Sequence, residues 1–266
     1  MQASAGRAAQ LLLESRPLGF IRHALAATLL LVAVAFTAPA IAANVAPQVM
    51  QASRPGPVLV FGGSGQLGSE IVHRLVERGY SVTVFVRPTS DRSRVAGLPV
   101  SFVEGNVLVE ADVRRAFDSA RFRTVVDALG RSESGVEFYA TSGRLIARWA
   151  KATGVSQTIL HSSVGVGASR AAYPPALFPE RSPLFVAKEA GENALIDSGL
   201  NYTIIRNAIL RDLPAGAPDG ARLFEDERKF GVVSRRGLAR LTLECIDNPG
   251  CARKVFHAVD DGMSIR

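Results

Sequence analysis

The sequence is poor in cysteine and histidine, and this scarcity argues against metal-dependent and disulfide-framed folds. Among 266 residues there are two cysteines, Cys245 and Cys251, and four histidines. A structural zinc site needs about four ligands at characteristic spacings, which these cysteines do not provide. A framework of several disulfides is equally excluded. One small-loop disulfide remains open if the domain is exported, but we expect two reduced thiols near a helix end, and no metal site.

A concentrated basic region is also missing. The chain has 31 Lys and Arg against 24 Asp and Glu, a net charge of +7, but its basic residues are scattered among acidic ones. Nucleic-acid-binding proteins usually carry a basic stripe or patch. We therefore expect no nucleic-acid partner, and the excess charge is most simply a solvated basic surface. A hydrophobic content of 47% with 21% charged residues is typical of an ordinary globular protein.

The first fifty residues differ from the rest. Residues 24–43 form an uncharged run rich in Ala, Leu and Val, preceded by Arg22 and ending near a small-x-small pattern at Ala40 and Ala42. Such a run is typical of a signal peptide, and twenty residues also just suffice to span a bilayer. We expect residues 1–49 to be a signal peptide or membrane anchor that engages the membrane or export machinery, followed by a linker over 50–56. The alternative is translation from Met50, which would leave the protein in the cytoplasm.

A glycine-rich turn follows the first predicted strand. The apolar run Val58–Phe61 predicts a strand buried on both faces of a parallel sheet. A helix with apolar residues at helical spacing leads from the turn to Gly79, and a second strand covers 81–86. Together they make a strand–turn–helix–strand unit that can hold a dinucleotide pyrophosphate. The expected contacts of the turn are Gly62, Ser64, Gly65, Gln66, Leu67 and Gly68.

Each glycine of the turn has a distinct physical role. Gly62 permits the sharp turn off the strand, and Gly65 lets the backbone approach a pyrophosphate without an intervening Cβ. Gly68 lets the helix pack closely on the strand, while the helix N-terminus offers amide groups and its dipole to the phosphates. The pattern therefore indicates a dinucleotide site.

The spacing Gly-x-x-Gly-x-x-Gly resembles that of the atypical short-chain dehydrogenase/reductase superfamily, in particular its NmrA-like, NAD(P)H-binding group. The resemblance extends over about residues 57–259. It implies an α/β fold, a Rossmann-type doubly wound parallel sheet with a small C-terminal cap, over residues 57–266. Further strands are expected at 99–104, 124–128, 157–161, 202–206 and 255–259, and further helices at 110–119, 136–153 and near 235–247.

Other cofactor contacts follow from the strand ends. The second strand ends at Arg87, where an NAD enzyme would carry an acidic residue; a guanidinium suits a 2′-phosphate, so we expect NADP rather than NAD. The resemblance assigns Asn106 to the adenine amine, although relatives carry aspartate there. It also places the segment Ala128, Leu129 and Gly130 beside the phosphate and ribose of the cofactor.

The catalytic region departs from the family pattern. The fifth strand ends in a motif that resembles the family's Ser-Ser-x-x-Val, so Ser163 is expected to hold a substrate carbonyl. The family's Tyr-x-x-x-Lys is represented by Lys188 alone, because Leu184 occupies the tyrosine position. Loss of a positioned acid or base typically costs about a hundred- to ten-thousand-fold in rate. Lys188 could itself act as the acid/base, Tyr173 could substitute, or the acceptor could take its proton from water.

Two further residues near this region carry open alternatives. Glu192 lies one turn after Lys188 and could form an intrahelical ion pair with it. His161, at the end of a predicted buried strand, could be a base, but we expect a hydrogen-bonded core residue.

The sequence thus supports two functions. The first is an NADP-dependent oxidoreductase that uses Ser163 and Lys188 to reduce a small carbonyl, quinone, flavin or conjugated substrate. The alternative is a non-catalytic NmrA-like sensor or scaffold that binds NADP. A sugar-nucleotide epimerase or dehydratase is disfavoured by the missing tyrosine and the small cap. The expected partner is a small molecule; the sequence indicates neither its identity nor the oligomeric state.

Overall fold

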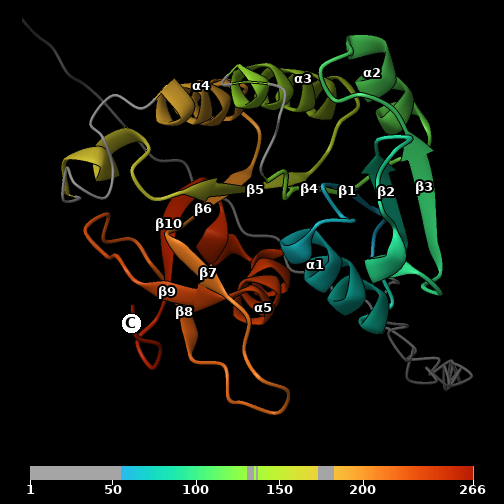
Figure 1. Cartoon of the computed structure of the whole chain (residues 1–266). Coiled ribbons are helices and arrows are strands. Elements are labelled where there is room, and N and C mark those ends of the chain that lie inside the picture. The colour runs from blue at the N-terminus through green and yellow to red at the C-terminus, as the bar shows by residue number, and fades with distance from the viewer. Residues whose placement is uncertain (1–54, 131–134, 136, 173–182, 266) are drawn as a thin grey trace, which may run out of the picture. The chain divides into compact units, whose positions relative to one another are not determined.

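The computed structural model describes residues 55–130, 135, 137–172 and 183–265 (Figure 1). The predicted signal or anchor segment and Tyr173 lie outside these residues, so both remain predictions. In the part of the chain that is described, no helix combines the length and apolar character needed to cross a membrane.

A single eight-stranded sheet forms the centre of the fold, in the order β3-β2-β1-β4-β5-β6-β10-β8. Neighbouring strands run parallel except at the edge, where β8 is antiparallel to β10. This confirms the predicted Rossmann-type sheet. The strands are β1 (Val58–Phe61), β2 (Val82–Val86), β3 (Val100–Glu104), β4 (Thr124–Asp127), β5 (Gln157–Ser163), β6 (Tyr202–Asn207), β8 (Ala221–Phe224) and β10 (Lys254–Asp260).

Helices cover both faces of the sheet, as Figure 1 shows. Helices α1 (Gln66–Glu77) and α5 (Arg235–Cys245) pack on one face, while α2 (Glu110–Asp118), α3 (Phe138–Ala152) and α4 (Pro183–Asp197) pack on the other. The strand pleat explains the division: Val58 and Val60 join the α1 side, whereas Leu59 and Phe61 join the α2–α3 side. All four residues are fully buried, which accounts for the unbroken apolar run of β1.

Three strands were not predicted from the sequence: the edge strand β8 and two short strands. β7 (Ile209–Arg211) and β9 (Val232–Ser234) pair in parallel as a separate two-stranded sheet. Each has three residues, too few to show an alternating pattern. Together with the edge strand β8 they lie between β6 and α5 in the chain, where the small cap was expected.

The expectation of two reduced thiols is wrong, because Cys245 and Cys251 form a disulfide with a Cα–Cα distance of 5.4 Å. Cys245 ends α5, and the chain turns back through Asp247, whose φ of 57° lies in the left-handed region, into a short 3₁₀ turn. Gln157 of β5 donates to the carbonyl of Cys245 (2.7 Å). Thr203 of β6 donates to the carbonyl of Cys251 (2.9 Å). These two hydrogen bonds therefore fasten the disulfide-closed loop after α5 to the central sheet.

Candidate functional site

A large pocket lies at the carboxyl ends of the central strands, with a volume of about 1120 Å³. This is the edge of the sheet where open α/β folds bind their ligands. All but one of the predicted site residues line it; Gly68 lies behind the turn. The predicted residues that line the pocket are Gly62, Ser64, Gly65, Gln66, Leu67, Arg87, Asn106, Ala128, Leu129, Gly130, Ser163 and Lys188. Their contacts with a cofactor remain predictions.

The glycine turn closes one end of this pocket. Gly62 has a φ of 76°, and a Cβ there would lie 2.6 Å from the carbonyl oxygen of Ala128. A Cβ on Gly68 would lie 2.1 Å from the carbonyl oxygen of Gly62. The fold itself therefore requires these two glycines. A Cβ on Gly65 would meet only one atom, the carbonyl oxygen of Gly62 at 3.2 Å, so this position is freer within the protein and faces the pocket.

Helix α1 begins directly at the turn and leaves its N-terminus open to an anion. Its N-cap, Gly65, offers no side-chain hydrogen bond, and its first turn carries no acidic residue. Backbone amides and the helix dipole at such an end favour negatively charged groups. The arrangement suits the phosphates of a dinucleotide.

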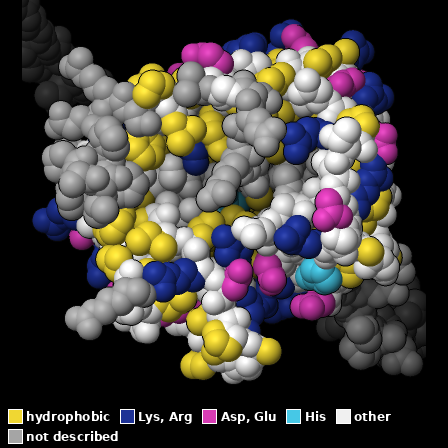
Figure 2. Space-filling model, in the orientation of Figure 1, with side chains coloured by type: hydrophobic (Ala, Val, Ile, Leu, Met, Phe, Trp, Pro, Cys, Tyr) yellow, Lys and Arg dark blue, Asp and Glu magenta, His cyan; other side chains and the backbone are white. Residues whose placement is uncertain are grey.

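Among the described residues, Arg87 offers an available guanidinium at the outer end of the pocket. Arg87 is exposed, lines the pocket and has no ion pair within the described residues, and its backbone amide donates to Ser90 Oγ (3.1 Å). Arg92 is already engaged, because it pairs with Glu104 and lies over the ring of Phe102. Arg87 is therefore the arginine that can meet a 2′-phosphate. On the face shown in Figure 2, basic and acidic side chains are intermingled and form no continuous basic stripe.

Asn106 also lines the pocket, but its side-chain oxygen and its backbone amide already form hydrogen bonds. Its amide oxygen accepts a hydrogen bond from the backbone of Leu108 (3.0 Å), and its own backbone amide donates to Asp112 (2.8 Å). The oxygen retains a second lone pair. A contact between Asn106 and the adenine amine stays a prediction.

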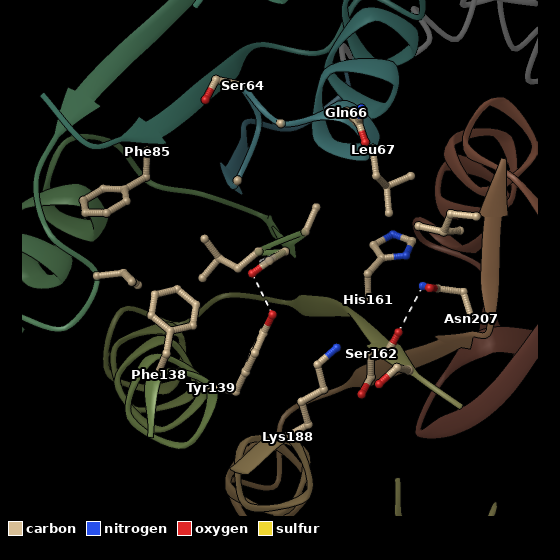
Figure 3. A pocket seen from close by; sticks show the side chains of 18 of the residues that line it. Ser64, Gln66, Leu67, Phe85, Phe138, Tyr139, His161, Ser162, Lys188 and Asn207 are labelled. Carbon is tan, nitrogen blue, oxygen red and sulfur yellow. Dashed lines mark hydrogen bonds between the residues drawn. The ribbon is translucent and has the colours of Figure 1, made fainter. Parts of the chain in front are cut away.

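Ser163 of β5 and Lys188 of α4 both line the pocket, and Figure 3 shows the Lys188 side chain near the end of β5 at Ser162. The hydroxyl of Ser163 is buried and has no hydrogen-bond partner among the described residues. Leu184 also lines the pocket, with 39% of its surface exposed, so an apolar side chain occupies the place of the family's phenol. The inner end thus has an amine and a hydroxyl available, without the usual tyrosine.

Tyr139 is a pocket residue that the sequence analysis missed. It lies in the first turn of α3, and its hydroxyl donates to the carbonyl of Gly130 (2.7 Å; Figure 3). The Lys188 Nζ atom lies 4.7 Å from the centre of its ring. Burial, with the charge of Asp127 as a smaller contribution, raises the pKa of Tyr139, which is therefore a neutral phenol. Only the packing of α3 against α4 reveals this neighbour of Lys188.

Two glycines set how closely those helices approach. A Cβ on Gly143 of α3 would lie 2.7 Å from the Cα of Gly191 in α4. A Cβ on Gly191 would lie 2.7 Å from the carbonyl oxygen of Tyr139. Gly191 is three residues after Lys188, and Gly143 is four after Tyr139, so this contact lies about one helical turn from the two side chains.

His161 is buried and hydrogen-bonded, as expected, and it also lines the pocket. Its Nε2 atom lies 2.9 Å from Thr242 Oγ1, and Thr242 donates its own proton to the carbonyl of Leu238. His161 must therefore donate from Nε2, which leaves Nδ1 unprotonated. Burial lowers the pKa of His161 to about 4, so the ring is neutral at neutral pH.

An ion pair between Lys188 and Glu192 is not formed. The Glu192 carboxylate, only 2% exposed, binds Arg206 of β6 at 2.7 Å from Nη2 and 3.2 Å from Nε. Glu227 binds the same guanidinium from its other side, at 2.8 Å. A buried guanidinium with planar, two-pronged geometry holds the carboxylate more strongly than an amine on the same helix. Lys188 is left free to face the pocket.

A family model described as NAD(P)H-binding matches residues 62–249, well over half of the chain. The chain belongs to this NAD(P)H-binding family. The matched region includes the glycine turn, the strand ends and α4, and it confirms the resemblance to the atypical short-chain dehydrogenase/reductase group. Within the described residues, no cluster of His, Cys, Asp and Glu could hold a metal ion.

The chain is similar to a protein from Arabidopsis thaliana, the chloroplastic protein High Chlorophyll Fluorescence Phenotype 244. It is 31% identical over 183 residues, which are 66% of this chain and 42% of that protein. The chain thus spans less than half the length of this relative.

Two solved structures share the fold. ChuY, an anaerobilin reductase from Escherichia coli O157:H7, has a TM-score of 0.68 at 21% identity, over 79% of this chain and 100% of the other. A short-chain dehydrogenase/reductase from Veillonella parvula, in complex with NADP, has a TM-score of 0.63 at 17% identity, over 78% and 95%. At these identities the likeness shows the fold alone.

Proposed function

We propose that the protein is an NADP(H)-dependent reductase that acts on a small carbonyl, quinone, flavin or conjugated acceptor. The observation that carries this is a single pocket with an open helix N-terminus at one end and the free Lys188 amine beside the Ser163 hydroxyl at the other. The fold shared with ChuY, an anaerobilin reductase, supports a reductase.

The preference for NADP rests on Arg87. A guanidinium can form charge-assisted, two-pronged contacts with a phosphate. We expect NADPH to bind at least about tenfold more tightly than NADH, or about 1.4 kcal/mol. Arg87→Ala should remove most of this difference. Arg92→Ala is the matched control, because Arg92 is engaged by Glu104 and should leave the ratio unchanged. Equal calorimetric affinities for both cofactors in the wild type would refute the preference.

The residues of the inner pocket supply the remaining roles. When bound, the nicotinamide would supply a hydride. Ser163 would donate a hydrogen bond to the acceptor oxygen, and Lys188 would hold the ribose hydroxyls and give a proton to the atom that gains negative charge. Leu184 keeps the neighbouring wall apolar. An acceptor that spreads its negative charge by conjugation needs less help from an acid, which fits the absent tyrosine.

The test is NADPH oxidation by the full chain with a panel of quinones, flavins, enones and simple carbonyls. Lys188→Met should weaken cofactor binding by about 1.5–3 kcal/mol, the value of a hydrogen bond to a charged group. Its effect on turnover should be far larger, up to about ten-thousand-fold. Leu184→Tyr restores the family's spacing and should raise the rate with simple carbonyls.

A second function, an NADP-binding sensor without catalysis, is favoured by one observation: Leu184 stands where the family carries its phenol. A sensor would bind NADPH tightly, and Lys188→Met would change binding alone. If neither wild type nor Leu184→Tyr reduces any acceptor while NADPH still binds, the sensor replaces the reductase.

We further propose that the domain works outside a reducing compartment, because disulfides persist mainly in exported proteins. The Cys245–Cys251 bridge supports export by the N-terminal segment over translation from Met50. Alkylation of the protein in intact cells, followed by mass spectrometry, should find both thiols blocked from reaction. Two alkylated thiols would indicate a cytoplasmic protein.

A further inference from the structure

A second, small cavity lies behind the inner end of the pocket. Its volume is about 20 Å³, and Asp127, Ser142, Ser162 and Lys188 are among its lining residues. A site of this size with several polar neighbours is suited to one water molecule. Lys188 lines both the small cavity and the main pocket, as do Leu129, Tyr139, His161 and Ser162.

Asp127 is an unusual residue for its position. It ends β4, whose other residues are buried, and it is itself only 5% exposed. One of its carboxylate oxygens accepts a hydrogen bond from the backbone of Leu129 (3.0 Å). Within the described residues it has no ion pair closer than 4.0 Å and no hydrogen bond to the second oxygen. Burial of such a carboxylate is costly unless a positive charge lies near.

Lys188 is the positive group at this cavity, and its own partners are few. Among the described residues its amine makes no ion pair or hydrogen bond and contacts the face of the Tyr139 ring. The titratable groups around it are Asp127 from β4, Tyr139 from α3, His161 from β5 and Glu192 from its own helix. Tyr139 and His161 are neutral, and Glu192 is held by Arg206. Asp127 is thus the carboxylate at this cavity without an arginine.

We propose that Asp127 is a positioning residue that keeps Lys188 protonated, acting across one water molecule held in the small cavity. The inference rests on the proposed function, in which Lys188 gives a proton to the acceptor. Burial lowers the pKa of Lys188, whereas the charges of Glu192 and Asp127 raise it. Without a nearby negative charge the amine would lose its proton more readily, and the site would lose its acid.

The proton balance of the step is simple. The hydride adds to the acceptor, the atom that gains the electron pair takes one proton from the Lys188 ammonium, and the neutral amine remains. The amine regains a proton from solvent through the open pocket. Asp127 gives up no proton in this sequence; its charge and the bridging water set how fully Lys188 is protonated before each turnover.

The direct test is the titration of Lys188 by nuclear magnetic resonance of protein labelled with ¹³C at the lysine Cε atoms. The chain has four lysines, and Lys188→Met assigns the signal. Asp127→Asn keeps the shape and the hydrogen bond from Leu129 but removes the charge. The charge of Asp127 raises the pKa of the amine, so this variant should shift the titration of Lys188 to lower pH.

Glu189→Gln is the matched control. Glu189 follows Lys188 in α4 but binds Arg170 and does not line the cavity. It should leave the titration of Lys188 unchanged. An unchanged titration in Asp127→Asn, or an equal change in both variants, would overturn the proposal. A crystal structure with no water between Asp127 and Lys188 would overturn the bridge.

Activity gives a separate readout. Asp127→Asn should move the alkaline limb of the rate–pH profile to lower pH. This shift should equal the shift in the pKa of Lys188 measured by titration. In a Lys188→Met background it should have no further effect, because the group it acts through is gone. If no acceptor is found, the proposed reductase fails while the titration still decides the role of Asp127.

Discussion

Replacing Asp127 with asparagine should stabilise the protein at alkaline pH and have little effect near pH 4. The side chain is buried at the end of β4, and burial raises its pKa from the ordinary 3.8 to about 6, against smaller opposing effects of the Leu129 amide and Lys188. Asparagine can accept the same backbone hydrogen bond without carrying a charge.

The sign and size of this change in the free energy of unfolding follow from proton linkage. Because the pKa is higher in the folded state, the folded protein binds the proton more tightly, and stability falls as the pH rises from about 4 to above 6. A rise from 3.8 to about 6 corresponds to about 3 kcal/mol in the free energy of unfolding once the group is fully ionised. Asparagine lacks this penalty, so its advantage should approach that value at pH 8.

Urea unfolding followed by circular dichroism at pH 4, 5, 6 and 8 measures the effect. Asp118→Asn is the control, because Asp118 is half exposed on α2 and pairs with Arg114 one turn away on the same helix. It should change stability by no more than about 0.5 kcal/mol at any pH. A variant Asp127→Asn that is less stable than wild type at pH 8, or whose gain is independent of pH, would refute the reasoning.

Three other changes are predicted together. Gly65→Val should abolish NADPH binding in calorimetry while circular dichroism shows an intact fold, and normal binding would refute the assigned turn. His161→Gln should flatten the loss of stability between pH 6.5 and 4, where the wild-type histidine resists protonation, while keeping a partner for Thr242; an unchanged acid limb would contradict the burial of the ring. Replacement of both Cys245 and Cys251 by serine should lower the unfolding free energy by about 2 kcal/mol for so short a loop, and reducing agent should do the same to wild type alone.

The sequence predicts the frame of the fold because that frame depends on local patterns. The unbroken apolar run of β1 and the helical spacing before Gly79 reflect burial and periodicity, and the observed bounds of β1 agree fully. The turn residues line the pocket because a parallel sheet brings its carboxyl ends together. The absence of the tyrosine beside Lys188 can also be predicted from the sequence, because Leu184 and Lys188 lie four residues apart on one helix.

Contacts between segments that are distant in the sequence cannot be predicted from such local patterns. Tyr139 contacts Lys188 because α3 packs against α4. Glu192 binds Arg206 because β6 packs against α4. The disulfide depends on a left-handed backbone conformation at Asp247, which the pattern of apolar residues does not predict. These partners are set by tertiary packing, which overrides local preference.

The glycine contact between α3 and α4 restricts how this pocket can be reshaped. Because Gly143 and Gly191 leave no room for even one methyl group, a larger residue at either position has to separate the helices and carry Tyr139 away from Lys188. An engineer who wishes to admit a bulkier acceptor should therefore keep this wall fixed. The opposite wall, where Leu67 of α1 and Leu210 of β7 face the same space, offers side chains that can be shortened without moving the lysine.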